Sequence, residues 1–199
     1  DSWAPHARIF YTLERLKERG WMRLDYPEPF VPFAEGFPTP SGRLEFRSER
    51  MAAAGLDPLA GYTPPYEAAQ RGTPLAERYP LALIAGADHY FLNSLFANVA
   101  DQLNRSGPPL LRLHPEDAAM RGLETGHEAR VFNDRGAFVA RVEITDRVRR
   151  GVVASTKGRW PRFMKGGATV NATVDERDSD MGGGAVFHDN RVEVTRAGP

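Results

Sequence analysis

Apolar residues near the start of the chain recur at the spacing of an α-helix. Ile9, Leu13 and Leu16 fall on one helical face, and charged residues occupy the other. Gly20 stands where a glycine commonly caps the carboxyl end of a helix. The pattern therefore predicts a short amphipathic helix over residues 5–20.

Proline and aromatic residues alternate after this helix, over residues 21–40. Each proline fixes its own backbone and disfavours helix in the residue before it, so we expect an extended strap whose aromatic rings need a surface to cover them. A turn at 39–42 and an alternating strand over 43–47 are expected next. Residues 60–80, again rich in proline and glycine, are expected to form a linker.

Short strand patterns separated by brief helices fill the remainder of the chain. The predicted strands cover residues 81–85, 110–113, 129–133, 138–145, 151–155 and 186–194, and the predicted helices cover 92–103 and 115–122. Gly86 is expected to end the first strand, and Gly136 to supply the positive φ of a hairpin at 134–136. Every second residue from Phe138 is apolar, so one face of that strand is expected to be buried. Many short strands with helices between them predict a mainly β fold, a closed barrel with short helical inserts.

The composition is that of a globular chain without charge bias. Of 199 residues, 41% are hydrophobic, 26 are Lys or Arg and 26 are Asp or Glu, which gives a formal net charge of +0. A nucleic-acid-binding surface concentrates positive charge, and no long stretch does so here, so nucleic acid is not an expected partner. No apolar run approaches the roughly 20 residues that span a bilayer, so no membrane span is expected.

Cysteine is absent, which excludes disulfides, thiolate metal sites, cysteine-ligated iron–sulfur clusters and a cysteine nucleophile within these residues. The first residues, from Asp1 to Pro5, lack an initiator methionine and the basic-then-apolar pattern of a signal peptide. The sequence is therefore expected to be a piece of a longer protein.

Neither the histidines nor the serines form a familiar catalytic motif. The 5 histidines include no pair at the spacing of a zinc-binding helix, which favours loop histidines over a metal site. Ser94 lacks the Gly-x-Ser-x-Gly elbow that exposes a hydrolase nucleophile. A small hydrolase built on Asp88, His89 and Ser94 stays open as an alternative, which a screen with generic ester substrates would test.

The loop after the first barrel strand has the residues of an anion-binding turn. Asn93 and Ser94 open the helix predicted there, so N–H groups at its amino end can face a pyrophosphate, although ordinary helix capping explains these residues equally well. Asp117, or Asp134 at the hairpin tip, can accept two hydrogen bonds from a guanine edge. The glycines at 182–184 allow a large ligand to approach the backbone closely.

Five motifs follow one another along the chain. They are FPTPSGRLEF at 37–46; PLALIAG at 80–86 with His89, Asn93 and Ser94; HPEDA at 114–118 with VFNDRG at 131–136; GVV at 151–153 with Trp160; and VNA at 170–172 with DMGGG at 180–184, FHD at 187–189 and VEV at 192–194. In this order they resemble the C-terminal region of the molybdopterin oxidoreductases of the dimethyl sulfoxide reductase and formate dehydrogenase superfamily. The resemblance implies a six-stranded double-psi β-barrel at 76–199. It also implies that residues 1–75, with the helix and the proline-rich strap, are the tail of a preceding catalytic domain plus a linker.

By this resemblance the chain holds molybdopterin guanine dinucleotide, with molybdenum or tungsten, for two-electron oxygen-atom or hydride transfer. The residues implied to bind this cofactor are Gly86, His89, Asn93, Ser94, His114, Asp117, Asn133, Asp134, Asn171 and Gly183. No catalytic residue and no metal ligand is expected in this chain, which is not expected to be active alone. An iron–sulfur cluster is expected only in the missing upstream region. Many relatives have Asn-x-Leu-Thr where this chain has Asn-Ala-Thr-Val at 171–174, which is a departure from the pattern.

The resemblance also implies the partners. They are the upstream domains of the same polypeptide, an electron-transfer subunit, and a second copy of the excised domain through the aromatic face that excision leaves bare. The expected compartment is the cytoplasm, with the periplasm as the alternative. The alternative function is a double-psi barrel that recognises protein and has no redox role. The loop at Asn93 and Ser94, Asn171 and the glycines at 182–184 argue against that alternative.

Overall fold

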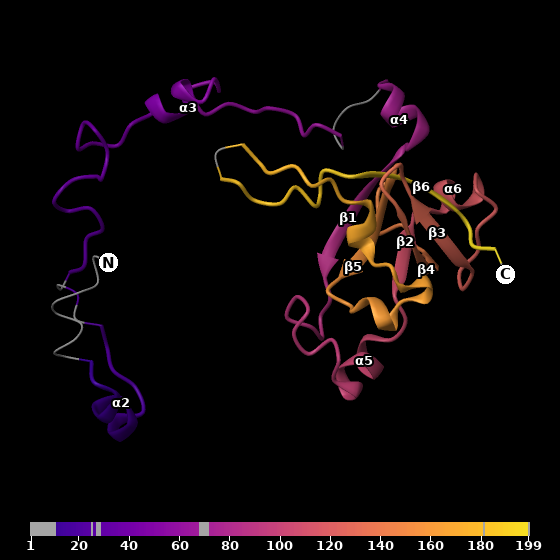
Figure 1. The fold of residues 1–199 in the computed structure, drawn as a ribbon, viewed down its shortest axis with the longest axis horizontal. Coiled ribbons are helices and arrows are strands. Elements are labelled where there is room, and N and C mark those ends of the chain that lie inside the picture. Colours follow the sequence, from indigo (N-terminus) through magenta and orange to yellow (C-terminus); the bar gives the residue numbers. More distant parts are fainter. Residues whose placement is uncertain (1–10, 25, 27–28, 68–71, 181, 199) are drawn as a thin grey trace. The chain divides into compact units, whose positions relative to one another are not determined.

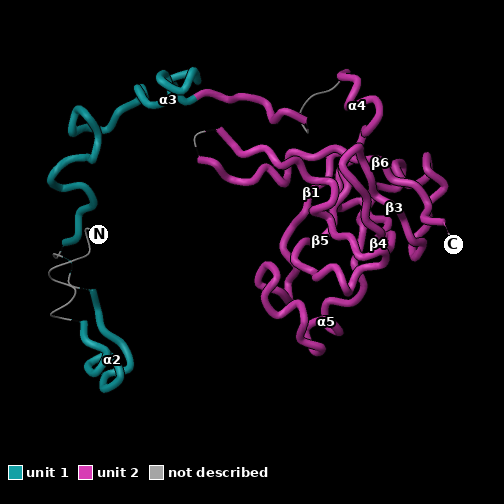
Figure 2. The backbone as a smooth tube through the Cα atoms, viewed as in Figure 1, with its two compact units in different colours: residues 1–60 teal, residues 61–199 magenta. Residues whose placement is uncertain are grey.

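The computed structural model describes residues 11–24, 26, 29–67, 72–180 and 182–198. The chain divides into two compact units, residues 1–60 and residues 61–199 (Figure 2). The predicted division at 75/76 stays a prediction about the domains of the parent protein. Among the helices of the described ranges, none has the length and apolar character needed to cross a membrane.

The first unit contains two short helices. Helix α2 (Leu13–Arg19) begins after Thr12, whose side chain accepts a hydrogen bond from the Arg15 N–H, and ends at Gly20 with φ of 76°. The amphipathic helix is thus confirmed over 13–19, and its predicted first residues, 5–10, lie outside the described residues. Helix α3 (Glu49–Ala53) is capped by the side chain of Ser48.

The strand predicted over 43–47 is wrong. Only Arg47 takes part in β-pairing, as an isolated bridge to Leu59. The alternation of apolar residues in this segment has no partner strand, so Leu44 and Phe46 are 63% and 85% exposed. The strap leaves other aromatic rings exposed within this unit, including Trp21, Phe30 and Phe33.

The second unit contains six strands and several short helices (Figure 1). The strands are β1 (Leu81–Ala87), β2 (Leu110–Leu113), β3 (Glu128–Phe132), β4 (Ala137–Ile144), β5 (Val152–Lys157) and β6 (Arg191–Arg196). The helices are α4 (Pro74–Arg78), α5 (Ala100–Ser106) and α6 (Pro115–Ala119), with 3-10 turns η1 (Pro161–Phe163), η2 (Lys165–Gly167) and η3 (Val170–Thr173). Helix α4 lies inside the predicted linker, where Thr73 caps it and Pro74 begins it.

The six strands close into a barrel in the order β1-β5-β2-β4-β3-β6. The pairs β1/β5 and β2/β4 are parallel, and the other four pairs are antiparallel. Exchanging β1 with β4, β2 with β5 and β3 with β6 reproduces both the strand order and the strand directions. The barrel therefore has an internal two-fold topology, that of the double-psi β-barrel, and the predicted fold class is confirmed.

The register of the strands sets which loops lie together. At the carboxyl ends of the parallel pair β1/β5, Ala87 is opposite Lys157. Strand β2 runs the other way, so its last residue, Leu113, is opposite Val153 near the amino end of β5. The loops after β1 and β5 therefore leave one end of this pair, and α6 begins at the other.

The barrel interior is filled by alternate residues of the six strands. Buried apolar residues include Leu81, Leu83, Leu111, Leu113, Val131, Phe138, Val142, Val153, Val192 and Val194. In β4, Phe138, Ala140 and Val142 are buried while the residues between them are not, which confirms the predicted buried face. Each large apolar side chain so buried stabilises the fold by roughly 1.5–3 kcal/mol.

The helix predicted over 92–103 is wrong in its first half. Helix α5 begins only at Ala100, after Val99 as N-cap. Asn93 and Phe96 have positive φ, 52° and 66°, which an α-helix cannot contain. The apolar residues that gave the helical pattern are instead exposed in a turn, where Leu92 bridges to Leu95. Asn93 and Ser94 therefore do not cap a helix.

Three further details differ from the sequence prediction. Gly86 does not end β1 but pairs with Thr156 inside the sheet. Gly136 does not have a positive φ; a Cβ there would lie 2.6 Å from the Ala172 carbonyl oxygen, so close packing, not turn geometry, requires glycine. Of the strand predicted at 186–194, only the part from Arg191 onward forms β6.

Candidate functional site

The loop after β1 and the loop after β5 lie against each other at the carboxyl ends of these strands. Gly158 has φ of 99°, and a Cβ on it would come within 2.1 Å of the Asn93 carbonyl oxygen. The indole N–H of Trp160 donates to the Ser94 carbonyl oxygen at 2.8 Å. The backbone of the 86–94 loop is thus held by the neighbouring loop through direct contact.

Four residues of the predicted site come together in this loop. Gly86, His89, Asn93 and Ser94 are all exposed. The His89 ring lies edge-on to Tyr90, with 5.1 Å between centroids. The loop therefore presents an imidazole, an amide and a hydroxyl to solvent on one backbone that its neighbour fixes.

A buried polar relay connects the two loops to α5. The Ser106 hydroxyl donates to Asp88 Oδ2 at 2.7 Å and accepts from Arg159 Nη2 at 2.8 Å. Arg159 Nη2 also donates to the Gly107 carbonyl oxygen at 2.6 Å. Burial lowers the pKa of Arg159, and the negative charge of Asp88 opposes this effect. Within the described ranges, Arg159 Nε is buried and has no hydrogen-bond acceptor.

Two other predicted residues, His114 and Asp117, lie at the opposite end of the β1/β5 pair. His114 caps α6, and its Nδ1 accepts from the Glu116 N–H at 3.2 Å. Asp117 is only 2% exposed, and its Oδ2 accepts from the Gly151 N–H at 2.7 Å. Five strand residues separate the two ends, about 17 Å at the usual rise, so these two residues do not join the 86–94 loop.

The predicted residues at the hairpin between β3 and β4 have partners within the chain. The Asn133 amide nitrogen donates to the Thr173 carbonyl, the Asn190 side chain and the Arg191 carbonyl, at 2.8, 3.1 and 3.0 Å. The Asp134 carboxylate accepts from the Tyr79 hydroxyl at 2.7 Å and pairs with Arg78. The hydrogen bond from Tyr79 lowers the pKa of Asp134.

The last two predicted residues are exposed on separate segments. Asn171 lies in η3, and its N–H points to the Thr169 hydroxyl at 3.4 Å. Gly183 has φ of 57° in a turn closed by the Ser179 N–H, which donates to the Gly184 carbonyl oxygen at 2.7 Å. Neither residue is joined to the 86–94 loop by a contact between the described residues.

One structural centre was missed from the sequence. Glu67 is 3% exposed, and its carboxylate receives both terminal nitrogens of Arg135. Arg191 Nε donates to the Glu67 carbonyl oxygen at 2.7 Å, and Asp189 accepts the N–H groups of Tyr66 and Glu67, both at 2.8 Å. These contacts connect the chain before α4 to the hairpin and to the start of β6. No local sequence signal marks them, because the partners are far apart along the chain.

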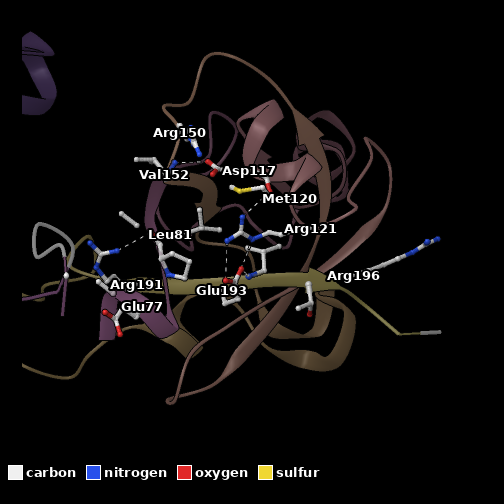
Figure 3. A pocket seen from close by; sticks show the side chains of 17 residues that line it. Glu77, Leu81, Asp117, Met120, Arg121, Arg150, Val152, Arg191, Glu193 and Arg196 are labelled. Carbon is white, nitrogen blue, oxygen red and sulfur yellow. Dashed lines mark hydrogen bonds and ion pairs between the residues drawn. The ribbon is translucent and has the colours of Figure 1, made fainter. Parts of the chain in front are cut away.

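A groove of about 890 Å³ lies on the wall of the barrel (Figure 3). It is lined by residues of α4, α6 and the strands β1, β5 and β6. Arg121 and Glu193 face each other across it and form two hydrogen bonds of 2.6 and 3.2 Å. Asp117 lies at its base beside Val152. The charged groups that line it are largely paired with one another.

Comparison with protein families gives one match. Residues 81–191 match the family described as "Molydopterin dinucleotide binding domain". The matched range includes β1 to β5 and reaches the first residue of β6.

Several curated proteins are similar over nearly the whole chain. A probable oxidoreductase of Bacillus subtilis, YoaE, is 33% identical over 96% of this chain, which is 26% of that protein. The dimethyl sulfoxide reductase DmsA of Escherichia coli is 33% identical over 83% of this chain and 22% of its own length. Trimethylamine-N-oxide reductase 1 of Escherichia coli is 31% identical over 96% of this chain and 25% of its own length. The chain thus spans about a quarter of the length of these relatives.

Among solved structures, acetylene hydratase from Pelobacter acetylenicus is similar with a TM-score of 0.72. It is 22% identical, and the match covers 86% of this chain and 26% of that one. At this identity the likeness concerns the fold alone.

Proposed function

Because this chain belongs to the family of molybdopterin dinucleotide-binding domains, we propose that it holds molybdopterin guanine dinucleotide within a larger molybdenum or tungsten oxidoreductase. The observation that carries the proposal is the exposed 86–94 loop, whose backbone is fixed by Gly158 and Trp160. A site that must orient a large cofactor needs such support from its neighbours.

The residues present fit an anionic, heteroaromatic group. His89, Asn93 and Ser94 offer hydrogen-bond donors and acceptors for a pterin ring and for phosphate oxygens. Beside them, Arg159 keeps a buried N–H without an acceptor in the described ranges. A buried donor without a partner is uncommon in folded proteins, and it is consistent with a site that an acceptor completes.

The proposed division of labour follows from the side chains. The bound cofactor supplies two-electron chemistry at its metal, with transfer of an oxygen atom or a hydride. This chain's residues bind and orient it: Gly86 lets the backbone approach, His89 and Asn93 hydrogen-bond to the ring, and Ser94 donates to a phosphate. The side chains of Asn133 and Asp134 already have partners inside the barrel, so the proposed cofactor face centres on the 86–94 loop.

The rest of the proposal concerns the longer protein. Since the chain covers only 26% of its similar relative YoaE, we place the metal ligand, any iron–sulfur cluster and the substrate channel in other parts of the polypeptide. Residues 1–75 would then be the tail of the preceding catalytic domain and the linker. We propose the upstream domains as the main partner of this chain, an electron-transfer subunit as a partner of the whole enzyme, and the cytoplasm as its compartment.

The test uses the complete reading frame that encodes this chain. The purified protein is analysed for molybdenum and tungsten by mass spectrometry and for the guanine nucleotide released by acid hydrolysis. We expect both metal and nucleotide, and we expect both to fall when His89, Asn93 and Ser94 are replaced together by alanine. A matched control replaces Asp146, Arg147 and Arg149, exposed residues beyond the far end of the β1/β5 pair, and keeps the cofactor. A complete protein without metal or pterin would favour a protein-recognition barrel.

A further inference from the structure

Three cations stand close together on the segment that follows β5. Each lies over an aromatic ring: Lys157 over Phe187 at 4.0 Å, Arg159 over Phe91 at 5.5 Å, and Arg162 over Trp160 at 4.6 Å. These three residues form what we call the 157–162 cation cluster. Held against rings, the side chains have fewer conformations to lose when they meet a ligand.

None of the three cations forms an ion pair with a carboxylate of the described residues. Cations elsewhere in the barrel commonly do. Lys165 pairs with Glu128, and Arg112 pairs with Glu143. The cluster is therefore a local excess of positive charge in a chain whose formal net charge is +0.

The cluster borders the proposed cofactor loop. Lys157 is opposite Ala87 in the sheet, and Trp160, beneath Arg162, donates to the Ser94 carbonyl oxygen. The nearby carboxylate of Asp88 is already engaged, since it accepts the Tyr90 N–H and the Ser106 hydroxyl. Positive charge thus lies beside the exposed loop with little compensation.

Arg159 retains hydrogen-bonding capacity inside this cluster. Its Nη2 is shared between the Ser106 hydroxyl and the Gly107 carbonyl oxygen, while its buried Nε has no acceptor among the described residues. Neutral oxygens on one nitrogen do not neutralise a guanidinium. A doubly charged anion with several oxygens would supply both the missing charge and the missing acceptor.

We propose that Lys157, Arg159 and Arg162 bind the pyrophosphate of a dinucleotide whose heteroaromatic end lies against the 86–94 loop. This inference deepens the proposed function and rests on it. The lysine acts as a point charge, and the arginines present planar forks that match phosphate oxygens. Family motifs did not indicate these residues, because their signal is the absence of carboxylate partners in space.

The test measures binding of two probes, inorganic pyrophosphate and guanosine diphosphate, to the 199-residue chain at low ionic strength. Amide chemical shifts in ¹H–¹⁵N spectra report both the affinity and the place. We expect saturable shifts at 86–94 and 157–162 with both probes, and none with guanosine. The triple variant Lys157→Gln, Arg159→Gln, Arg162→Gln should bind at least about tenfold more weakly, as expected for removal of three phosphate contacts.

A matched control is available on β3. Arg130 lies over the Phe132 ring at 4.4 Å and has no ion pair within the described ranges, yet it is far along the chain from the cluster. Arg130→Gln should therefore leave the affinity unchanged. Circular dichroism and the melting temperature verify that the triple variant is folded, and the single variants are measured in its place if it is not.

Three results would overturn the inference: no saturable binding by the unmodified chain, equal binding by the triple variant, or tighter binding of a single-stranded oligonucleotide than of guanosine diphosphate. The proposed function has its own readout, the metal and pterin content of the complete protein. Failure of one test therefore does not decide the other.

Discussion

The carboxylate of Glu67 receives Nη1 and Nη2 of Arg135 at 2.7 and 2.9 Å, and 68 residues separate the two in sequence. Arg191 donates to the carbonyl oxygen of the same Glu67, at 2.7 Å. The polypeptide that enters the barrel is thereby fixed to the β3–β4 hairpin and to the first residue of β6. The position of this entering segment depends on one buried acidic residue.

Loss of the Glu67 charge should therefore destabilise the barrel. Glu67→Gln leaves Arg135, whose side chain is 30% exposed, without its main counter-charge. We expect the free energy of unfolding to fall by about 1–3 kcal/mol, less than for a fully buried pair because solvent reaches the arginine. Urea titration of both proteins gives the value. Glu49→Gln, which breaks the exposed pair with Arg47, should change it by less than about 1 kcal/mol. Equal effects of the two substitutions would contradict a special role for Glu67.

The acid dependence of stability should include a contribution from Asp134. The hydrogen bond from Tyr79 lowers the pKa of Asp134 in the folded protein below the model value of 3.8. A lowered folded-state pKa gives stability that is present above the unfolded-state pKa and is lost as the pH falls through the folded-state pKa. In Tyr79→Phe the Asp134 carboxyl should therefore titrate at a higher pH. Carboxyl ¹³C shifts between about pH 6 and about pH 2 measure this.

The control for this titration is Tyr90→Phe, which removes an exposed hydroxyl that is not a partner of Asp134. It should leave the Asp134 titration unchanged. If Asp134 titrates alike in the unmodified chain and in Tyr79→Phe, the hydrogen bond does not set its pKa.

Gly158 should be intolerant of a side chain for two separable reasons. Its φ is 99°, and a Cβ would lie 2.1 Å from the Asn93 carbonyl oxygen. Gly126 has nearly the same φ, 95°, with nothing within 4 Å of its Cβ position. Gly126→Ala should thus report backbone strain alone, about 1–3 kcal/mol, and Gly158→Ala should cost more than this. Unfolding free energies give the difference, and amide shifts at Asn93 and Ser94 should change only in Gly158→Ala. Equal costs with no shift at Asn93 would mean that the two loops are not in contact.

The barrel itself was accessible from the sequence, whereas its loops were not. Alternating apolar residues such as Phe138 and Val142 predicted strands correctly, because burial of one face of a strand imposes a period of two. The residues 92–99 have apolar spacing that fits a helix equally well, and only the positive φ values of Asn93 and Phe96 exclude it. Those values depend on packing against Gly158, which sequence spacing cannot express.

The site was predictable to a similar extent. Family motifs identified His89, Asn93 and Ser94, which the structure brings together in one exposed loop. Residues that act through long-range partners gave no local signal: Glu67 required Arg135, and Arg159 is notable only because its buried Nε lacks an acceptor in the described ranges. Such features arise from the strand order of the barrel, which joins segments that are distant in sequence.

The groove in Figure 3 lies beside a part of β6 that has a strand neighbour on one side only. Strand β1 pairs with β6 at Leu81 and Ala82 alone, so beyond Val192 the edge facing the groove is not covered by a strand. Here Glu193 Oε1 accepts the Val194 N–H at 2.7 Å while its carboxylate holds Arg121. The carboxylate occupies a backbone donor that would otherwise be available to another strand.

Replacing this carboxylate should therefore loosen the edge of β6. In Glu193→Ala we expect the Val194 amide to exchange with solvent several-fold faster, and the free energy of unfolding to fall by about 1–3 kcal/mol, because the Arg121 side chain is only 12% exposed and loses its partner. Glu143→Ala is the matched control, since it removes a half-exposed pair with Arg112 on a strand that has neighbours on both sides. Hydrogen exchange monitored by NMR measures the first effect, and urea titration measures the second. If Val194 exchanges at an unchanged rate in Glu193→Ala, the side chain does not protect this edge, and the ion pair with Arg121 acts on stability alone.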